Sequence, residues 1–120
     1  MRCRPYCKAW FELETNRIKR LFVADTFVSR FRGALGKNQL VVGDALWIKP
    51  CNSVHTFGMT YSIDVIYLDA QKRIKKIVTD IRPNRVSGSL KAKSVVEMKS
   101  GEINRLDLRV GMFMNVENIK

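Results

Sequence analysis

The residues best suited to chemistry in this 120-residue chain gather in one segment, from Cys51 to Asp64. The segment holds the chain's single histidine, His55, one of its three cysteines, and an aspartate that opens an apolar stretch. A cysteine near a histidine can act as a nucleophile, because the imidazole accepts the thiol proton. A carboxylate beside them can orient the base or donate a proton. Cys51, His55 and Asp64 are therefore one candidate catalytic set.

The same segment also predicts a ligand pocket. If residues 54–59 and 63–68 form a hairpin, Asp64 lies opposite Gly58, where no cross-strand side chain fills the space. Strand alternation then puts His55 and Asp64 on opposite sides of the hairpin, which disfavours a catalytic pair. An aspartate at a turn can instead accept main-chain N–H groups, and this structural role stays open. The predicted ligand surface consists of His55, Thr56, Phe57, Gly58 and Asp64.

Metal chemistry has little support in the sequence. Structural zinc sites need four Cys or His ligands at paired spacings, and this chain has one histidine and no Cys-x-x-Cys motif. Cys3 and Cys7 could form a disulfide or bind a metal, but reduced thiols in a basic tail are the simpler interpretation. We therefore expect no metal and no cofactor.

The charge of the chain points to a second class of partner. It carries 22 Lys and Arg against 11 Asp and Glu, a net charge of +11. Residues 1–40 have a net charge of +6 and residues 71–120 one of +7, whereas residues 41–70 have one of −2. Such basic flanks suit nucleic acid or anionic lipid, or they only keep the protein soluble. The candidate polyanion contacts in the exposed stretch around residues 83–93 are Arg82, Arg85, Lys91 and Lys93.

Hydrophobic periodicity predicts short strands and two short helices in a single domain over residues 17–116, after a basic extension, 1–16, that could hold a first strand. The last residues, 117–120, are a tail. One helix follows an N-cap at Asp25 or Thr26, and the other follows Ser100, with Ile103 and Leu106 facing inward. The expected fold is α+β, a small, largely antiparallel β-barrel or sandwich of six to seven strands. The expected strands are 9–13, 20–24, 46–49, 64–68, 74–81, 94–98 and 112–114.

No run of apolar residues reaches the roughly 18 to 20 needed to span a bilayer. The basic start of the chain is not followed by the apolar core of an export signal. We therefore expect a cytoplasmic protein.

Several short blocks, in order, carry a family resemblance. They are Ala-Asp-Thr at 24–26, Arg-Gly-Ala-Leu-Gly at 32–36, and Thr-Phe-Gly-Met at 56–59 leading into Ile-Asp-Val-Ile-Tyr-Leu-Asp at 63–69, with closing blocks at 96–98, 100–101 and 110–111. Over residues 17–115 the chain resembles the prokaryotic domain of unknown function 192 family. The resemblance implies a compact β-rich α+β domain and no established activity. It also implies that many relatives are exported or lipid-anchored.

The prediction from the sequence is a non-enzymatic binding or accessory module that takes a small ligand or peptide in the pocket around His55–Gly58 and Asp64. Two alternatives stay open. One is an enzyme that uses Cys51 as nucleophile and His55 as base. The other is a non-specific binder of nucleic acid or another polyanion through the basic flanks.

Overall fold

The molecule is organised around a sheet whose neighbouring strands are mostly distant in the sequence. The computed structural model describes residues 6–13, 15–24 and 40–118. One short helix within these ranges, α2 (Glu102–Arg105), follows β8. The strands are β1 (Cys7–Trp10), β2 (Arg17–Ala24), β3 (Asp44–Ile48), β4 (Ser53–His55), β5 (Ile63–Leu68), β6 (Ile74–Ile81), β7 (Val86–Gly88), β8 (Ser94–Lys99) and β9 (Asn115–Asn118).

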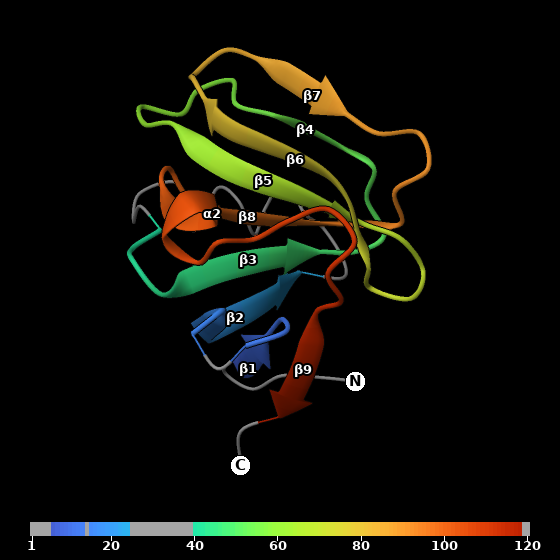
Figure 1. The fold of residues 1–120 in the computed structure, drawn as a ribbon. Helices are drawn as coiled ribbons and strands as arrows, with labels where there is room; N and C mark the ends of the chain where they lie inside the picture. Colours follow the sequence, from blue (N-terminus) through green and yellow to red (C-terminus); the bar gives the residue numbers. More distant parts are fainter. Residues whose placement is uncertain (1–5, 14, 25–39, 119–120) are drawn as a thin grey trace.

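Seven of these strands form one mixed sheet in the order β6-β5-β8-β3-β2-β1-β9 (Figure 1). β2 and β3 run parallel, and the other neighbours in the sheet are antiparallel. β4 and β7 form a separate antiparallel pair beyond β6, at the top of Figure 1. Because β6 and β9 are the two edges of the large sheet, it is open and not closed into a barrel.

The central strands are covered on both faces, which explains their almost unbroken apolar composition. All residues of β3 and β5 are buried. Strand side chains alternate between faces, so Ile66 and Leu68 pack into one cluster while Val65 and Tyr67 pack into another. The first cluster includes residues of α2 and of the segment after it, and the second includes Val54 of β4. The small β4–β7 pair thus lies on the face opposite α2.

The α+β expectation is confirmed in its broad form, but the barrel and the second helix are not confirmed. The helix expected after residue 25 lies outside the described residues. The expected helix near residue 100 is α2, with Ile103 and Leu106 buried. Its N-cap is Gly101 and not Ser100, because the Ser100 hydroxyl donates to Asp80 Oδ1 at 2.9 Å.

Most predicted strands exist with ends shifted by a few residues, and β6 has the predicted bounds. The last strand is an exception: β9 comes after residues 112–114, of which Phe113 forms an isolated bridge with Arg73. The exposed stretch 83–93, in which the sequence predicted no strand, contains β7. β1 lies within the predicted N-terminal extension and is part of the sheet, between β2 and β9.

The predicted hairpin between residues 54–59 and 63–68 is wrong. β4 pairs with β7, with His55 opposite Val86, whereas β5 pairs with β6 on one side and β8 on the other. Residues 56–59 form a turn, in which the Met59 N–H donates to the Thr56 carbonyl at 3.2 Å. Because β5 has both edges occupied, no edge of it remains for β4.

Candidate ligand-binding face

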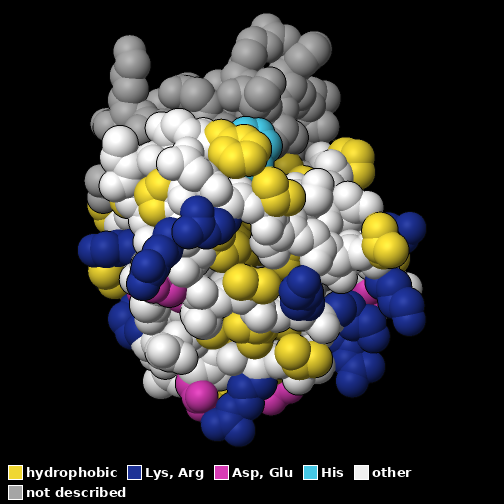
Figure 2. Space-filling model, turned by 90° about the horizontal axis from the view of Figure 1, so that it is seen from above, with side chains coloured by type: hydrophobic (Ala, Val, Ile, Leu, Met, Phe, Trp, Pro, Cys, Tyr) yellow, Lys and Arg dark blue, Asp and Glu magenta, His cyan; other side chains and the backbone are white. Residues whose placement is uncertain are grey.

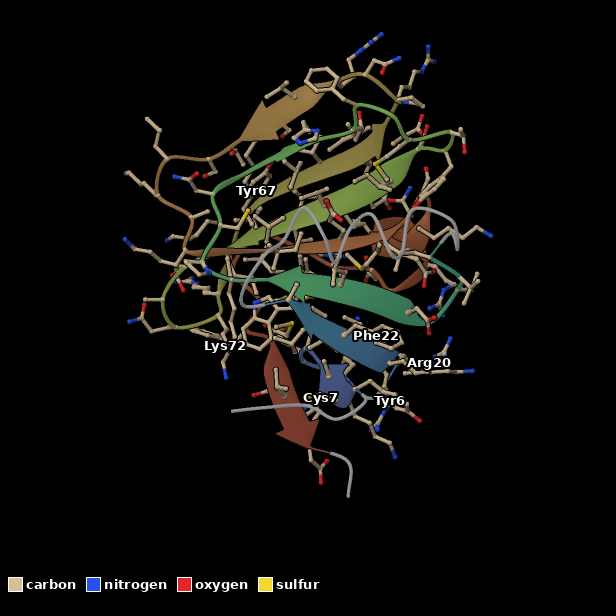
Figure 3. All side chains as sticks on the ribbon, turned by 180° about the vertical axis from the view of Figure 1, so that it is seen from behind. Tyr6, Cys7, Arg20, Phe22, Tyr67 and Lys72 are labelled. Atoms are coloured by element: carbon tan, nitrogen blue, oxygen red, sulfur yellow. The ribbon has the colours of Figure 1, made fainter. Side chains whose placement is uncertain are left out.

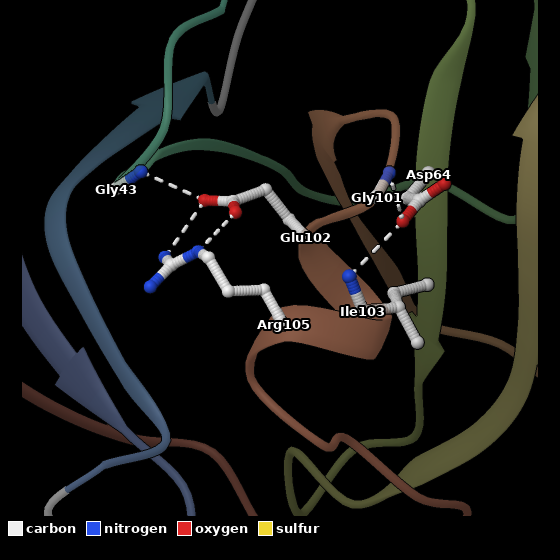
Figure 4. Close-up of polar contacts among 6 residues, drawn as sticks. All are labelled: Gly43, Asp64, Gly101, Glu102, Ile103 and Arg105. Carbon is white, nitrogen blue, oxygen red and sulfur yellow. Dashed lines mark hydrogen bonds and ion pairs between the residues drawn. The ribbon is translucent and has the colours of Figure 1, made fainter.

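Asp64 of β5 lies inside the molecule and not at a pocket. Its side chain is fully buried, and its carboxylate accepts three main-chain hydrogen bonds. Oδ1 accepts from the N–H of Asp80 at 2.8 Å. Oδ2 accepts from the N–H groups of Gly101 and Ile103 at 3.0 Å each (Figure 4). The expected position of Asp64 opposite Gly58 is therefore wrong. Asp64 instead has the structural role that the sequence left open, as an acceptor of main-chain N–H groups.

These bonds explain how the start of α2 is held against the sheet. The first N–H groups of a helix have no acceptor within the helix, and a negative charge at that end is favourable. Asp64 supplies both the acceptor and the charge from β5. It also holds Asp80 of β6, whose φ of 52° is unusual for a residue other than glycine. Asp64 is therefore a structural residue and leaves the predicted ligand surface.

A second buried carboxylate, Glu102, ties α2 to the turn before β3 (Figure 4). It accepts from the Gly43 N–H at 2.7 Å and forms two hydrogen bonds with the Arg105 guanidinium, at 2.5 and 3.0 Å. Burial opposes ionisation of Glu102, but the Arg105 and Gly43 hydrogen bonds and the positive charge of Arg105 outweigh it. Together they hold the pKa of Glu102 below its ordinary value.

Replacing Asp64 by asparagine tests the structural role. Asp64→Asn removes the charge and replaces one carboxylate oxygen by an NH2 group. This NH2 faces a main-chain N–H that then has no acceptor, so the substitution should lower the free energy of unfolding by about 2 to 4 kcal/mol. Urea denaturation measures the loss. Asp107→Asn is the matched control, because this exposed aspartate pairs with exposed Arg109, and its loss should stay below about 0.5 kcal/mol. Equal losses for the two variants would contradict this role.

The lowered pKa of Glu102 predicts a pH-dependent stability. A carboxylate whose pKa is lower in the folded state stabilises the fold above its unfolded pKa of about 4.3, and the gain disappears as pH falls through the folded value. Glu102→Gln should therefore cost about 1 kcal/mol at pH 7 and progressively less on acidification towards pH 3. Thermal or urea unfolding of both proteins across this range measures the difference. A difference that stays constant with pH would contradict the ion pair's contribution.

Thr56 fastens the turn after β4 to the segment that carries two of the predicted polyanion contacts. Its buried hydroxyl donates to the Arg82 carbonyl at 2.6 Å and accepts from the Arg85 N–H at 2.8 Å. Its own main chain bonds to Arg85 and Asn84 at 2.9 and 3.0 Å. Thr56 therefore does not face a ligand directly but fixes how its neighbours are presented.

The residues on either side of Thr56 point outward and form an aromatic pair. The rings of His55 and Phe57 are stacked, with centroids 5.2 Å apart and planes inclined by 26°. Phe57 is 58% exposed, so much of its ring faces solvent. Gly58, which follows, has a φ of 79°, and a side chain there would meet nothing within 4 Å. This glycine permits the turn and does not open a hollow above Asp64.

A groove of about 520 Å³ lies next to this pair, between β6 and the segment that contains β7. Its charged lining residues are three cations, Lys76, Arg82 and Arg85, and one acid, Asp80. Two contacts hold its walls together: the Tyr67 hydroxyl donates to Ser87 Oγ and the Lys76 ammonium donates to the Gly88 carbonyl, both at 2.7 Å. Figure 2 shows this face of the molecule, with the histidine against an exposed apolar side chain and Lys and Arg side chains around the apolar ones.

Tyr67 acts as a fixed, neutral donor beneath the groove. Burial raises the pKa of its hydroxyl, and the hydrogen bond to Ser87 offsets the rise only in part. Because the phenol stays protonated, it can hold β7 against the sheet at any ordinary pH. Lys76 lies over the Tyr67 ring, 5.5 Å from its centroid, and shares in this attachment.

The structure separates the members of the predicted catalytic set. The Cys51 thiol donates to the Ser53 carbonyl at 3.0 Å, and the residue packs against the core clusters. His55 points outward onto Phe57, and Asp64 is in the interior. Among the described residues no group of three or more His, Cys, Asp or Glu is placed to hold a metal ion.

The remaining predicted residues lie elsewhere. Lys91 and Lys93 are exposed, and Lys93 lines a different cleft from Arg82 and Arg85.

Cys7 is disulfide-bonded, so the expectation of reduced thiols throughout was wrong for this residue, while Cys51 is a free thiol. Sequence reasoning missed Lys76 and Ser87, because only the approach of β7 to β6 makes them part of one groove.

In the part of the chain that the structure describes, an open mixed sheet has one short helix on one face and a small β-pair on the other, which defines an α+β domain. A family model matches residues 11–116, and the chain belongs to that family, the uncharacterised domain of unknown function 192 family. The resemblance seen in the sequence is thereby confirmed.

The names of the curated relatives that match this chain give no activity. The chain is 35% identical to a UPF0127 protein of Thermococcus gammatolerans, covering 74% of this chain and 61% of that protein. It is 34% identical to one of Thermococcus kodakarensis, covering 87% and 64%. The chain thus spans less than two thirds of the length of these relatives. A crystal structure of a protein of unknown function from Novosphingobium aromaticivorans matches with a TM-score of 0.75 at 16% identity, covering 90% of this chain and 83% of that one.

Within the described residues, no helix has the length and apolar character needed to cross a membrane.

The hydroxyl of Thr56 provides a direct test of how this face is held. Thr56→Val keeps the shape but leaves the Arg82 carbonyl and the Arg85 N–H without this partner, so it should cost about 1 to 2 kcal/mol. It should also speed hydrogen exchange at the Arg85 amide. Thr56→Ser retains the hydroxyl and is the control, in which exchange at Arg85 should stay slow. If Val and Ser exchange alike at this amide, the hydroxyl does not hold the segment.

Proposed function

We propose that the protein is a non-enzymatic binding module for single-stranded nucleic acid, which it holds on the face formed by β4, β6 and β7. The observation that carries the proposal is the exposed stacked pair of His55 and Phe57 beside a groove whose charged lining residues are three cations and one aspartate. Single-strand binding proteins combine these two features, because bases stack on exposed aromatic rings and phosphates follow a positive groove.

The attachment of the two features to each other supports one continuous surface. His55 is opposite Val86, which lines the groove, and Thr56 is bonded to the main chain of both Arg82 and Arg85. The aromatic pair and the arginines are therefore presented together by one rigid unit. Less flexibility in the free protein means less entropy lost on binding.

The distribution of acids supports an anionic partner. Asp44, Asp64, Glu97 and Glu102 are buried, so fewer than the chain's 11 acids remain to offset its 22 Lys and Arg at the surface. The potential at the surface is correspondingly more positive than the sequence totals alone suggest.

The other predicted functions have weaker support. A small-ligand pocket between Gly58 and Asp64 loses its acidic wall, because that carboxylate is bound to three amides. A Cys–His enzyme needs the thiol and the imidazole within hydrogen-bond reach, whereas Cys51 packs inward and His55 points outward.

Fluorescence anisotropy with a labelled oligo-deoxythymidine tests the proposal. Phe57→Ala should weaken binding about tenfold, since stacking of one base is worth about 1 to 3 kcal/mol. Arg82→Gln/Arg85→Gln should weaken binding and lower the slope of log affinity against log salt by about 1.4, at about 0.7 per single-strand phosphate contact.

Matched controls separate stacking from general attraction. Phe113→Ala removes a phenylalanine of similar exposure, 47%. Lys8→Gln/Lys19→Gln removes the same charge from exposed positions of β1 and β2, which are separated from β6 by at least three strands. Neither should change affinity by more than about twofold. Heparin, which has no bases, should bind wild type and Phe57→Ala equally. An oligonucleotide that also binds these two proteins equally would refute the proposal and leave only non-specific attraction of polyanions.

A further inference from the structure

A second cleft, of about 340 Å³, lies where β3 and β5 end and β8 begins. Its floor includes Trp47 of β3, which is 5% exposed, and the buried Ser94. Three lysines and one aspartate line it, so the ammonium groups exceed the carboxylates by two. The lining side chains that carry charge are Lys49, Lys72, Lys93 and Asp69.

The main chain around the cleft is fixed by hydrogen bonds from several elements. The Lys93 N–H donates to the Leu68 carbonyl at 2.8 Å, and the Lys93 carbonyl accepts from Cys51 at 3.0 Å. The Lys72 carbonyl accepts from Met114 at 2.8 Å, and Lys72 has a φ of 65°. Figure 3 shows Lys72 at the end of the molecule toward which β2 and β3 point. The lysines that line the cleft are therefore carried by a main chain that hydrogen bonds hold in place.

The aspartate is already used by the turn that it begins. Asp69 Oδ1 accepts from the N–H groups of Gln71 and Arg73 at 2.9 and 3.0 Å. Lys49 lies over the Trp47 ring, 4.1 Å from its centroid. Like charges brought together without an equal number of anions repel one another, and a bound anion would relieve this repulsion.

An independent observation points to a missing acceptor. The indole Nε1–H of Trp47 is the only buried side-chain polar atom among the described residues without a hydrogen-bond partner. Leaving a buried donor unpaired costs about 1 to 3 kcal/mol, so such groups are rare unless a ligand or water completes them. The unpaired donor belongs to a side chain that lines the lysine cleft. Because the Nε1 atom itself is enclosed by protein, an oxyanion reaches it once the ring turns toward the cleft.

We propose that this cleft binds a small free oxyanion of the phosphate class. Its oxygens accept from the ammonium groups of Lys49, Lys72 and Lys93 and supply the acceptor that the Trp47 indole lacks. Charge-assisted hydrogen bonds of this kind are short and strong, and several together favour a dianion. The inference does not depend on the proposed nucleic-acid function, whose groove residues are different.

The indole protons provide a readout with an internal control. The chain has two tryptophans, Trp10 and Trp47, so a ¹⁵N-labelled sample gives two indole N–H signals, assigned with Trp10→Phe. Inorganic phosphate is titrated against sodium chloride of equal ionic strength at pH 7.5. The Trp47 signal should move downfield and saturate, as expected for a new hydrogen bond, while the Trp10 signal should stay in place.

Charge variants complete the test. Lys72→Gln/Lys93→Gln should raise the half-saturating phosphate concentration about tenfold, and Lys19→Gln/Lys99→Gln should change it less than about twofold. Both remove two charges from the surface, so a general effect of net charge would shift them equally and would overturn the proposal. So would a Trp47 signal that does not saturate.

Dimethyl phosphate distinguishes a free oxyanion from a phosphodiester of nucleic acid or lipid. It carries one charge and two blocked oxygens, so it should move the Trp47 signal much less than phosphate does at the same concentration. An equal effect would overturn the assignment to a free oxyanion and would identify the cleft as a contact for a diester chain.

Discussion

The carboxylate of Asp64 is the contact on which the arrangement of this domain depends. It is the only charged group of β5, it is fully buried, and it accepts hydrogen bonds from β6 and from the start of α2. A buried charge is costly unless it is well paired, and three amide donors provide this pairing. The helix is too short to be stable by itself, so its position is set from the sheet.

Other buried polar groups repeat this role at smaller scale. Glu102 joins α2 to Gly43 and Arg105, and Arg20 forms two hydrogen bonds with Asp44, at 2.7 and 2.5 Å. On the other face, Thr56 joins the turn after β4 to the segment before β7. Glu102 and Thr56 bind main-chain groups of turns and irregular segments that have no partner in a regular ladder. The Arg20–Asp44 bonds instead add to a regular pairing, because these two residues are opposite each other in β2 and β3.

This use of the acids explains the character of the surface. Several carboxylates are buried, where Asp64 and Glu102 bind main-chain amides and Asp44 and Glu102 bind arginines. Most lysines and arginines of the described residues lie at the surface. Two hollows of the surface, between β6 and β7 and beside Trp47, are consequently lined mainly by cations among their charged residues. A protein of this kind attracts anions from solution before any specific contact forms.

The sequence was sufficient to predict the strands with strong β-branched and apolar patterns. β5, β6 and β8 were predicted to within one residue at each end. A run of apolar residues indicates a strand buried on both faces, and alternation of apolar and polar residues indicates a strand buried on one face. The sequence blocks that carry the family resemblance could likewise be recognised without the structure. Short or polar elements such as β4 and β7 were missed, since three residues carry too little pattern to be recognised.

The neighbours of each strand came only from the tertiary structure. The sequence placed Asp64 after a turn and suggested a local hairpin, whereas β5 is enclosed by β6 and β8 and β4 pairs with β7, some thirty residues along the chain. Periodicity records which side of a strand is buried but carries no information about which strand lies beside it. The sequence by itself therefore determined the strands, the basic charge and the family, and the long-range pairing decided that Asp64 is structural and that the exposed aromatic pair meets the cations.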